Sequence, residues 1–196
     1  MQERIQKIIS ASGLMSRRAA EKLIADGKVT VNGVTASPGM KADPAEDNIL
    51  AEGRPVGRKN AFHYLMMNKP AGVVTTLHDE QGRRSVAELL HGIGARVYPV
   101  GRLDMYSEGL LLFTDDGEFA NLLMHPSSGI PKTYRLKVKA DTVEQRLHSL
   151  AQPIEIDGRM TTPAVLSEIR ASGEEATLMV TIHEGRNRQI RRLCER

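Results

Sequence analysis

Two apolar runs separated by a short polar connection place the strongest constraint on how this chain can fold. Val97–Val100 and Leu110–Phe113 are predicted to be buried strands, because both are short, rich in β-forming side chains and bounded by glycine. The connection between them opens with Gly101-Arg102-Leu103-Asp104. Connections that follow strands commonly present functional groups. Asp104 is therefore the first candidate for chemistry, whereas an isolated acid at such a place is more often a turn residue that caps local amides.

Composition sets the class of protein. The chain has 196 residues, of which 40% are hydrophobic, so it can bury a core in one good-sized domain and a smaller one. Its net charge is only +3, but its arginines are clustered, which favours a polyanionic partner. Cys194 is the single cysteine and excludes an internal disulfide and a cysteine-based metal site. No apolar run is long enough to span a membrane, so we expect a soluble, cytoplasmic protein without a membrane partner.

The N-terminal part is predicted to form two helices followed by a hairpin. Isoleucines recur at helical spacing near the start, and Ser16 is a good N-cap for a second helix that ends at Gly27. The alternating strand Val29–Val31 then leads into Asn32-Gly33, the strongest two-residue hairpin signal. We expect a compact helix–helix–hairpin domain over residues 1–57.

A connecting segment is expected after this domain. The stretch Gly53–Asn60 is polar and interrupted by glycine and proline, which is typical of a linker, and we place the linker itself at residues 58–61.

Two adjacent arginines make the start of the second helix a candidate anion site. Arg17 and Arg18 directly follow Ser16, in the first helical turn, where the helix dipole disfavours each cation by about 0.3–1 kcal/mol. A bound phosphate would compensate for this unfavourable interaction with the dipole. The alternative, which these two residues alone favour, is that both arginines are simply solvated. The segment Ser16–Gly33 as a whole resembles the small RNA-binding domain shared with ribosomal protein S4, and this resemblance implies that both arginines contact RNA.

The segment that follows Gly101 carries a second resemblance. Gly101–Gly117 closely resembles the signature of pseudouridine synthases of the RsuA/RluB branch, in which the acid of Gly-Arg-Leu-Asp is the catalytic aspartate. Ser107 stands where that branch usually has threonine, and it keeps the hydroxyl group. Asn68–Thr76 also matches the family, although its residues alone predict only a structural bend at Lys69-Pro70.

A later strand carries a tyrosine of interest. Lys132–Lys139 alternates cleanly, which places Tyr134 on the inward face. On these residues alone Tyr134 is more often a core residue. The Lys-x-Tyr pattern nevertheless resembles the family element whose tyrosine contacts the target uracil, and it groups Lys132 with the RNA-binding residues.

The third matching element is basic. The predicted strand Leu178–His183 leads into a helical start over Glu184–Leu193, with Ile190 facing inward. Gly-Arg-x-x-Gln-Ile-Arg resembles the family motif whose final arginine pairs with the catalytic aspartate, which implies that Arg191 is the partner of Asp104. Arg186 is the alternative partner, or a phosphate contact.

The implied reaction needs no cofactor. The bond from uracil N1 to ribose is broken and C5 is joined instead, so one carboxylate suffices, acting as a nucleophile or by removing a sugar proton. The target base would be flipped out against Tyr134 and Ile190, with Arg102, Arg186 and Arg188 on flanking phosphates. Neither a cofactor nor a metal ion is expected, because Asp115 and Asp116 precede an apolar helical pattern and are predicted to begin a helix.

These observations together predict an α+β protein. An S4-type domain is followed at 62–196 by a pseudouridine synthase domain with a mixed, mostly antiparallel sheet. We expect it to act as a monomer on ribosomal RNA, the 23S RNA of the large subunit. The alternatives are a synthase for 16S rRNA, a non-catalytic RNA-binding or ribosome-assembly protein and, less favoured, a metal-dependent nuclease. Family members continue beyond the third motif, so we also expect this chain to be incomplete at its C-terminus.

Overall fold

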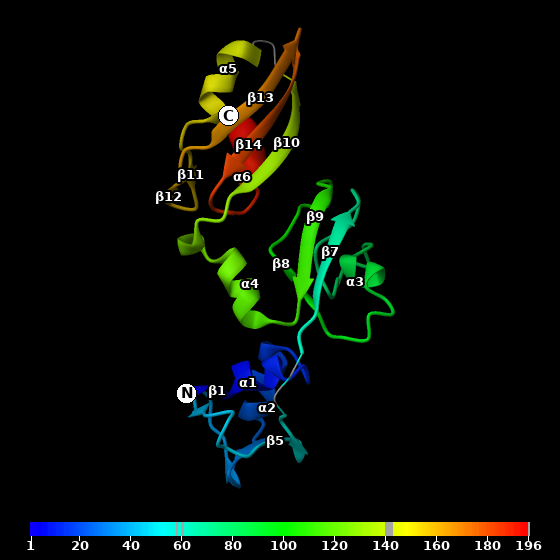
Figure 1. Cartoon of the computed structure of the whole chain (residues 1–196), viewed down its shortest axis with the longest axis vertical. Coiled ribbons are helices and arrows are strands. Elements are labelled where there is room, and N and C mark those ends of the chain that lie inside the picture. The colour runs from blue at the N-terminus through cyan, green and yellow to red at the C-terminus, as the bar shows by residue number, and fades with distance from the viewer. Residues whose placement is uncertain (58, 60, 140–142, 196) are drawn as a thin grey trace. The chain divides into compact units, whose positions relative to one another are not determined.

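The computed structural model describes residues 1–57, 59, 61–139 and 143–195 (Figure 1). The chain divides into two compact units, Met1–Ala120 and Asn121–Arg196. None of the helices in the described part of the chain combines the length and hydrophobicity that a membrane-spanning helix needs.

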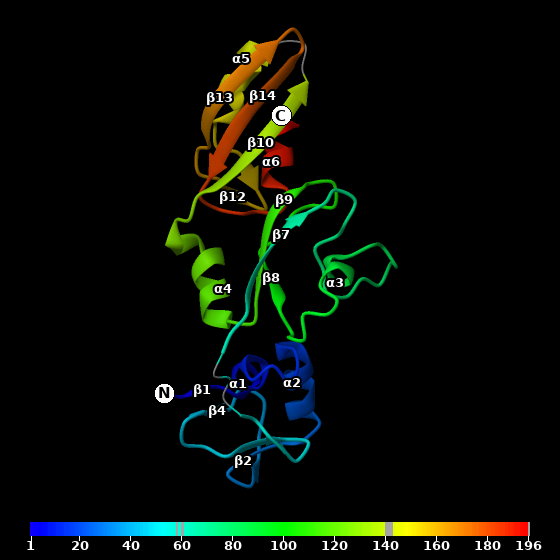
Figure 2. The same ribbon diagram turned by 45° about the vertical axis from the view of Figure 1, so that its right-hand side comes forward.

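The N-terminal part of the first unit contains two helices and short antiparallel strands. Helices α1 (Ile5–Ala11) and α2 (Arg17–Ala25) pack against each other (Figure 2). Strand β1 (Glu3–Arg4) pairs with β4 (Lys41–Ala42). A four-stranded sheet follows in the order β3 (Val34–Thr35), β2 (Val29–Val31), β5 (Ile49–Ala51) and β6 (Arg54–Pro55). Fully buried aliphatic side chains from the helices and strands form its core, among them Ile5, Ile9 and Val29.

Local sequence signals explain most of this domain. The Ser16 side chain accepts a hydrogen bond from the Ala19 amide at 3.1 Å, which confirms the predicted N-cap. Asn32 and Gly33 both have positive φ, 52° and 82°, as a tight hairpin turn requires. Part of the linker-like stretch Gly53–Asn60 belongs to the sheet: Arg54–Pro55, within the domain predicted at 1–57, pairs with β5 as an edge strand, a position that proline tolerates. The predicted linker at 58–61 lies partly outside the described residues, since 58 and 60 are not described.

The rest of the first unit is built on a three-stranded antiparallel sheet. Its order is β7 (Tyr64–Lys69), β9 (Gly109–Thr114) and β8 (Tyr98–Val100), and α3 (Val86–Leu89) lies beside it. Both predicted strands around the Asp104 connection are confirmed. Their expected burial is only half right, because strand residues alternate between faces. Leu111 and Phe113 join the core, whereas Leu110 is 66% exposed and Met66 on β7 is 81% exposed.

The second unit is another antiparallel sheet with helices on one face. The strand order is β10 (Lys132–Lys139), β14 (Glu175–Ile182) and β13 (Val165–Ser172). The remaining elements are α5 (Val143–Leu150), the hairpin of β11 (Glu155–Ile156) and β12 (Arg159–Met160), and α6 (Gln189–Cys194). Helix α4 (Gly117–Met124) and the short η1 (Pro126–Ser128) precede them.

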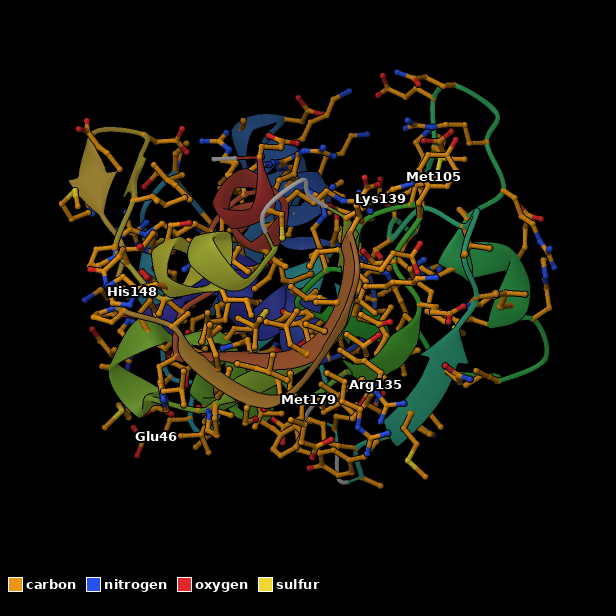
Figure 3. All side chains as sticks on the ribbon, turned by 90° about the horizontal axis from the view of Figure 1, so that it is seen from above. Glu46, Met105, Arg135, Lys139, His148 and Met179 are labelled. Atoms are coloured by element: carbon orange, nitrogen blue, oxygen red, sulfur yellow. The ribbon has the colours of Figure 1, made fainter. Side chains whose placement is uncertain are left out.

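Alternation along the central strand decides which face is buried. Leu178, Val180 and Ile182 of β14 point to one face, where Leu150 of α5 and Leu193 of α6 pack on them. Arg135 and Met179 are opposite each other on β10 and β14 and lie on the other face (Figure 3). The described strands of both units are antiparallel and combine with helices, so the predicted α+β class is confirmed.

Candidate active site

Asp104 lies in the connection between β8 and β9, and its two neighbours are held by the backbone segment that follows β7. The Thr75 hydroxyl donates to the Leu103 carbonyl at 2.7 Å and accepts from the Leu103 amide at 3.3 Å. On the other side, the Gly72 amide donates to the Met105 carbonyl at 2.7 Å. The half-buried Asp104 is thus fixed from both sides by chain that is distant in sequence.

The turn that contains Asp104 is closed locally as well. Its carbonyl accepts a hydrogen bond from the Ser107 amide at 3.0 Å. Gly72, which makes the bond to Met105, has φ of 82°, a conformation that glycine adopts without steric cost. The expected bend after Lys69 therefore exists, and it places an amide against the Asp104 connection.

Lys69 is fully buried beneath this connection. Its ammonium group donates to the carbonyls of Pro70 at 2.9 Å, Val73 at 2.8 Å and Met105 at 3.4 Å. Burial lowers the pKa of Lys69, and the negative charge of Asp104 opposes this change. Three acceptors match the three N–H donors of an ammonium group, so the cation is satisfied without water. A fixed positive charge thus acts on the carboxylate of Asp104.

Sequence reasoning assigned Lys69 only to a bend and did not single out Thr75. A signal for Lys69 was present, because it occupies an inward position of the alternating strand Tyr64–Lys69, where a lysine needs a partner. Thr75 carried no comparable signal. Its hydrogen bonds depend on how two segments meet.

Tyr134 and Lys132 lie at the start of β10 in the second unit. Tyr134 is half-buried, is paired with Val180 of β14 and packs against the core cluster of this unit. This placement suits a core tyrosine, and its contact with a uracil stays a prediction. Lys132 donates to the Ile130 carbonyl at 3.4 Å.

The third motif forms a loop followed by a short helix. The predicted helical start was wrong at its N-terminal end, because the chain continues as a loop through His183–Arg188 and α6 begins at Gln189. Arg188 has φ of 52°, a left-handed conformation in which a helix cannot continue. Ile190 and Arg191 are half-buried in the first turn of α6, and the inward position of Ile190 is confirmed.

Arg186 is engaged within the second unit. Its Nε donates to Glu184 at 2.9 Å, and its terminal nitrogens donate to the carbonyls of Arg159 and Met160, each at 2.6 Å. Sequence reasoning foresaw a phosphate or aspartate partner and missed this structural role. The nearby Glu184 carboxylate, two residues earlier, is the signal that was available.

The candidate residues thus fall into two groups. Arg102 and Asp104 belong to the first unit, with Arg102 exposed, and Lys132, Tyr134, Arg186, Arg188, Ile190 and Arg191 belong to the second. The pairing of Asp104 with Arg191 stays a prediction. Arg17 and Arg18 are exposed in the first turn of α2, as expected, and their contact with RNA also stays a prediction.

The two acids after β9 have structural partners. Asp116 accepts from the amides of Glu118 and Phe119, each at 3.0 Å, and thereby caps α4 as predicted. Asp115 accepts from the His63 amide at 2.8 Å and from the Lys59 ammonium. Burial alone would raise the pKa of Asp115, but the hydrogen bonds from Lys59 and His63 outweigh it and lower the pKa to about 2.

Comparison with known proteins places the chain among RNA-modifying enzymes. The family model described as RNA pseudouridylate synthase matches residues 63–196, and that of the S4 domain matches residues 3–49. The ribosomal large subunit pseudouridine synthase B of Bacillus subtilis is 43% identical over 98% of this chain and 80% of its own length. The protein of that name from Vibrio vulnificus is 38% identical over the whole of this chain and 62% of its own length.

A solved structure agrees with these matches. A crystal structure of a pseudouridylate synthase is 29% identical, covers 97% of this chain and 81% of its own length, and superposes with a TM-score of 0.61. The Gly-Arg-Leu-Asp connection, the buried lysine beneath it and the basic third motif all lie within the matched residues. By these matches, the chain belongs to the RNA pseudouridylate synthase family and carries an S4 domain in its N-terminal part.

Proposed function

We propose that this enzyme converts a uridine of large-subunit ribosomal RNA to pseudouridine, with Asp104 as its catalytic residue. The observation that carries the choice of substrate is the 43% identity, over nearly the whole chain, to a protein named as a large-subunit synthase. The choice of Asp104 is supported by its motif and by a connection that is braced on both sides of the carboxylate.

The proposed chemistry sets two requirements for Asp104. It has to be ionised, and it has to keep its position against the sugar while the detached uracil turns over. For the first, the buried Lys69 ammonium supplies a positive charge that donates to the carbonyl of Met105, the residue after Asp104. The hydrogen bonds of Thr75 and Gly72 to the neighbouring residues support the second.

The bond changes balance without a cofactor. The C1′–N1 bond breaks, either as the Asp104 carboxylate attacks C1′ or after the carboxylate removes a sugar proton. After the base has turned, uracil C5 attacks C1′. In the first route this breaks the ester bond between C1′ and Asp104, and in the second the Asp104 carboxyl returns its proton to the sugar. The C5 hydrogen then leaves as a proton while N1 gains one. Arg191 stabilises the carboxylate, and Tyr134 and Ile190 contact the flipped base.

RNA binding is assigned to cations of both parts of the chain. Arg17 and Arg18 offer two exposed guanidinium groups at the start of α2, a place where helix amides also favour phosphate. Lys132, Arg102 and Arg188 hold phosphates that flank the target. A phosphate contact by Arg186 is the less favoured alternative, because its guanidinium group already has a structural role. We propose that the enzyme acts as a monomer in the cytoplasm.

The test is tritium release from ribosomal RNA labelled at uridine C5, because loss of that hydrogen reports isomerisation directly. The parent chain is compared with Asp104→Asn and with Glu108→Gln, a matched control that neutralises an exposed acid of the same connection. We expect release by the parent and by Glu108→Gln, and loss of activity in Asp104→Asn. Separate 23S and 16S substrates decide the choice of RNA.

The second candidate function, a non-catalytic RNA-binding protein, predicts a different result. The parent chain would then bind the labelled RNA in a filter assay and release no tritium.

A further inference from the structure

The loop between β14 and α6 contains a polar network centred on Glu184. The side chain of Glu184 is only 14% exposed. One carboxylate oxygen, Oε1, accepts from the Thr162 amide at 2.7 Å, from the Thr162 hydroxyl at 3.2 Å and from Nε2 of Gln189 at 3.2 Å. The other, Oε2, accepts from Nε of Arg186 at 2.9 Å. Four protein donors satisfy the hydrogen-bonding capacity of this carboxylate without water, so Glu184 can anchor the loop.

Gln189 closes this network from the first residue of α6. It is 2% exposed, which is unusual for a glutamine. Its Oε1 accepts from the Arg186 amide at 3.1 Å, while its Nε2 donates to Glu184. The side chain therefore ties the start of the helix to the loop that precedes it.

Arg186 connects the same loop to the β11–β12 hairpin. Besides Glu184, its guanidinium donates to the carbonyls of Ile156, Arg159 and Met160. Because these acceptors are fixed backbone groups around one tight hairpin, the planar guanidinium locks loop and hairpin in one arrangement.

The network stabilises a backbone conformation that the sequence would not adopt unaided. Arg188 has φ of 52° and ψ of 30°, and a residue with a Cβ atom holds this conformation only where its surroundings impose it. The turn at Arg188 sets the direction of the first helical turn, which carries Ile190 and Arg191.

We propose that Glu184 and Gln189 are positioning residues that hold Ile190 and Arg191 in the orientation the reaction requires. The inference rests on the proposed function of Arg191. It also gives Arg186 a structural task, because Glu184 and the hairpin carbonyls occupy its guanidinium group.

The first test is Glu184→Gln, which keeps the size of the side chain and replaces an acceptor oxygen with a donor. This donor would face either Arg186, or Thr162 together with Gln189, and all three residues donate to Glu184 themselves. We expect kcat for tritium release to fall about 10- to 100-fold, the range in which small misplacements act, while KM changes less than about threefold. Glu175→Gln, on the exposed far end of β14, is the matched control and should match the parent.

Rescue separates positioning from general stability. In the double variant Glu184→Gln with Gln189→Glu, a donor again meets an acceptor between the two positions, while the Thr162 amide still lacks its carboxylate acceptor. Recovery of part of the lost kcat supports the proposal. A Glu184→Gln variant with the kcat of the parent, or a loss that appears only in KM, would overturn it.

One measurement does not depend on turnover. Hydrogen exchange of the amides of Thr162, Arg186 and Gln189 should accelerate in Glu184→Gln but not in Glu175→Gln. Unchanged exchange overturns the positioning role even if the parent chain releases no tritium. The absence of tritium release with accelerated exchange would instead count against the proposed function alone.

Discussion

Removing one hydroxyl group beside the Asp104 connection should reduce both stability and turnover. Thr75→Val keeps the branched shape but deletes the group that donates to the Leu103 carbonyl at 2.7 Å and accepts from the Leu103 amide at 3.3 Å. Thr75 is 7% exposed, so water cannot readily replace either bond. Each neutral hydrogen bond contributes about 0.5–1.5 kcal/mol, and a buried group left unpaired costs about 1–3 kcal/mol. We therefore expect the free energy of unfolding to fall by about 2 kcal/mol.

The effect of Thr75→Val on turnover depends on the hydrogen bonds that still hold the Asp104 connection. The Gly72 amide still holds Met105 after the change, so the connection is anchored on one side of Asp104 and loose on the other. We expect kcat to fall about tenfold or more with KM for RNA little changed, because positioning is lost while RNA contacts persist. Thermal unfolding followed by circular dichroism should show Tm lower by about 4–8 °C.

Two control variants sharpen this experiment. Thr75→Ser keeps the hydroxyl and should retain most activity. Thr76→Val removes a hydroxyl that bonds only the nearby His78 carbonyl, at 2.6 Å, and should leave kcat unchanged. A Thr75→Val enzyme with parental kcat, or a Thr76→Val enzyme equally impaired, would refute the argument that Thr75 positions Asp104.

Other perturbations test the buried charges and the RNA-binding surface. Lys69→Met removes the ammonium from three carbonyls and should cost about 3–5 kcal/mol in urea unfolding, whereas the exposed Lys139→Met should cost less than about 0.5 kcal/mol. The pKa of Asp115 is lowered to about 2 from 3.8, so its contribution of about 2 kcal/mol is present above pH 4 and is lost as pH falls toward 2. Asp115→Asn should therefore flatten acid unfolding in that window, and an unchanged pH dependence would contradict the shift. Arg17→Ala with Arg18→Ala should raise the Kd for RNA and reduce the slope of log K against log salt by about 2, with kcat preserved at saturating RNA. An unaltered slope would show that neither side chain contacts phosphate.

Local sequence was sufficient wherever a signal and its structural consequence are neighbours in the chain. Ser16 caps the helix that starts beside it, Asn32-Gly33 turns the hairpin it connects, and Asp116 caps α4. The strands on both sides of the Asp104 connection could also be predicted. Which of their residues are buried was harder to predict. Leu110 and Leu111 have the same side chain and differ only in the face of β9 that they occupy, and the core lies on one face.

The Asp104 motif itself was evident in the sequence, but the means by which it is held was not. Thr75 and Gly72 reach this connection only because the chain bends back after β7, and Lys69 is buried only because that bend covers it.

The same division applies to the third motif. Gly185-Arg186 indicated a basic element, yet the sequence alone did not predict that Arg186 would bind Glu184 and the β11–β12 hairpin, nor that the helix would start as late as Gln189. The sequence by itself therefore determined the family, the S4 domain and the candidate carboxylate, because motifs and helix caps consist of residues that are close together in the chain. Only the tertiary structure decided which polar side chains brace that chemistry, because their partners come from distant segments and exist only once those segments have packed.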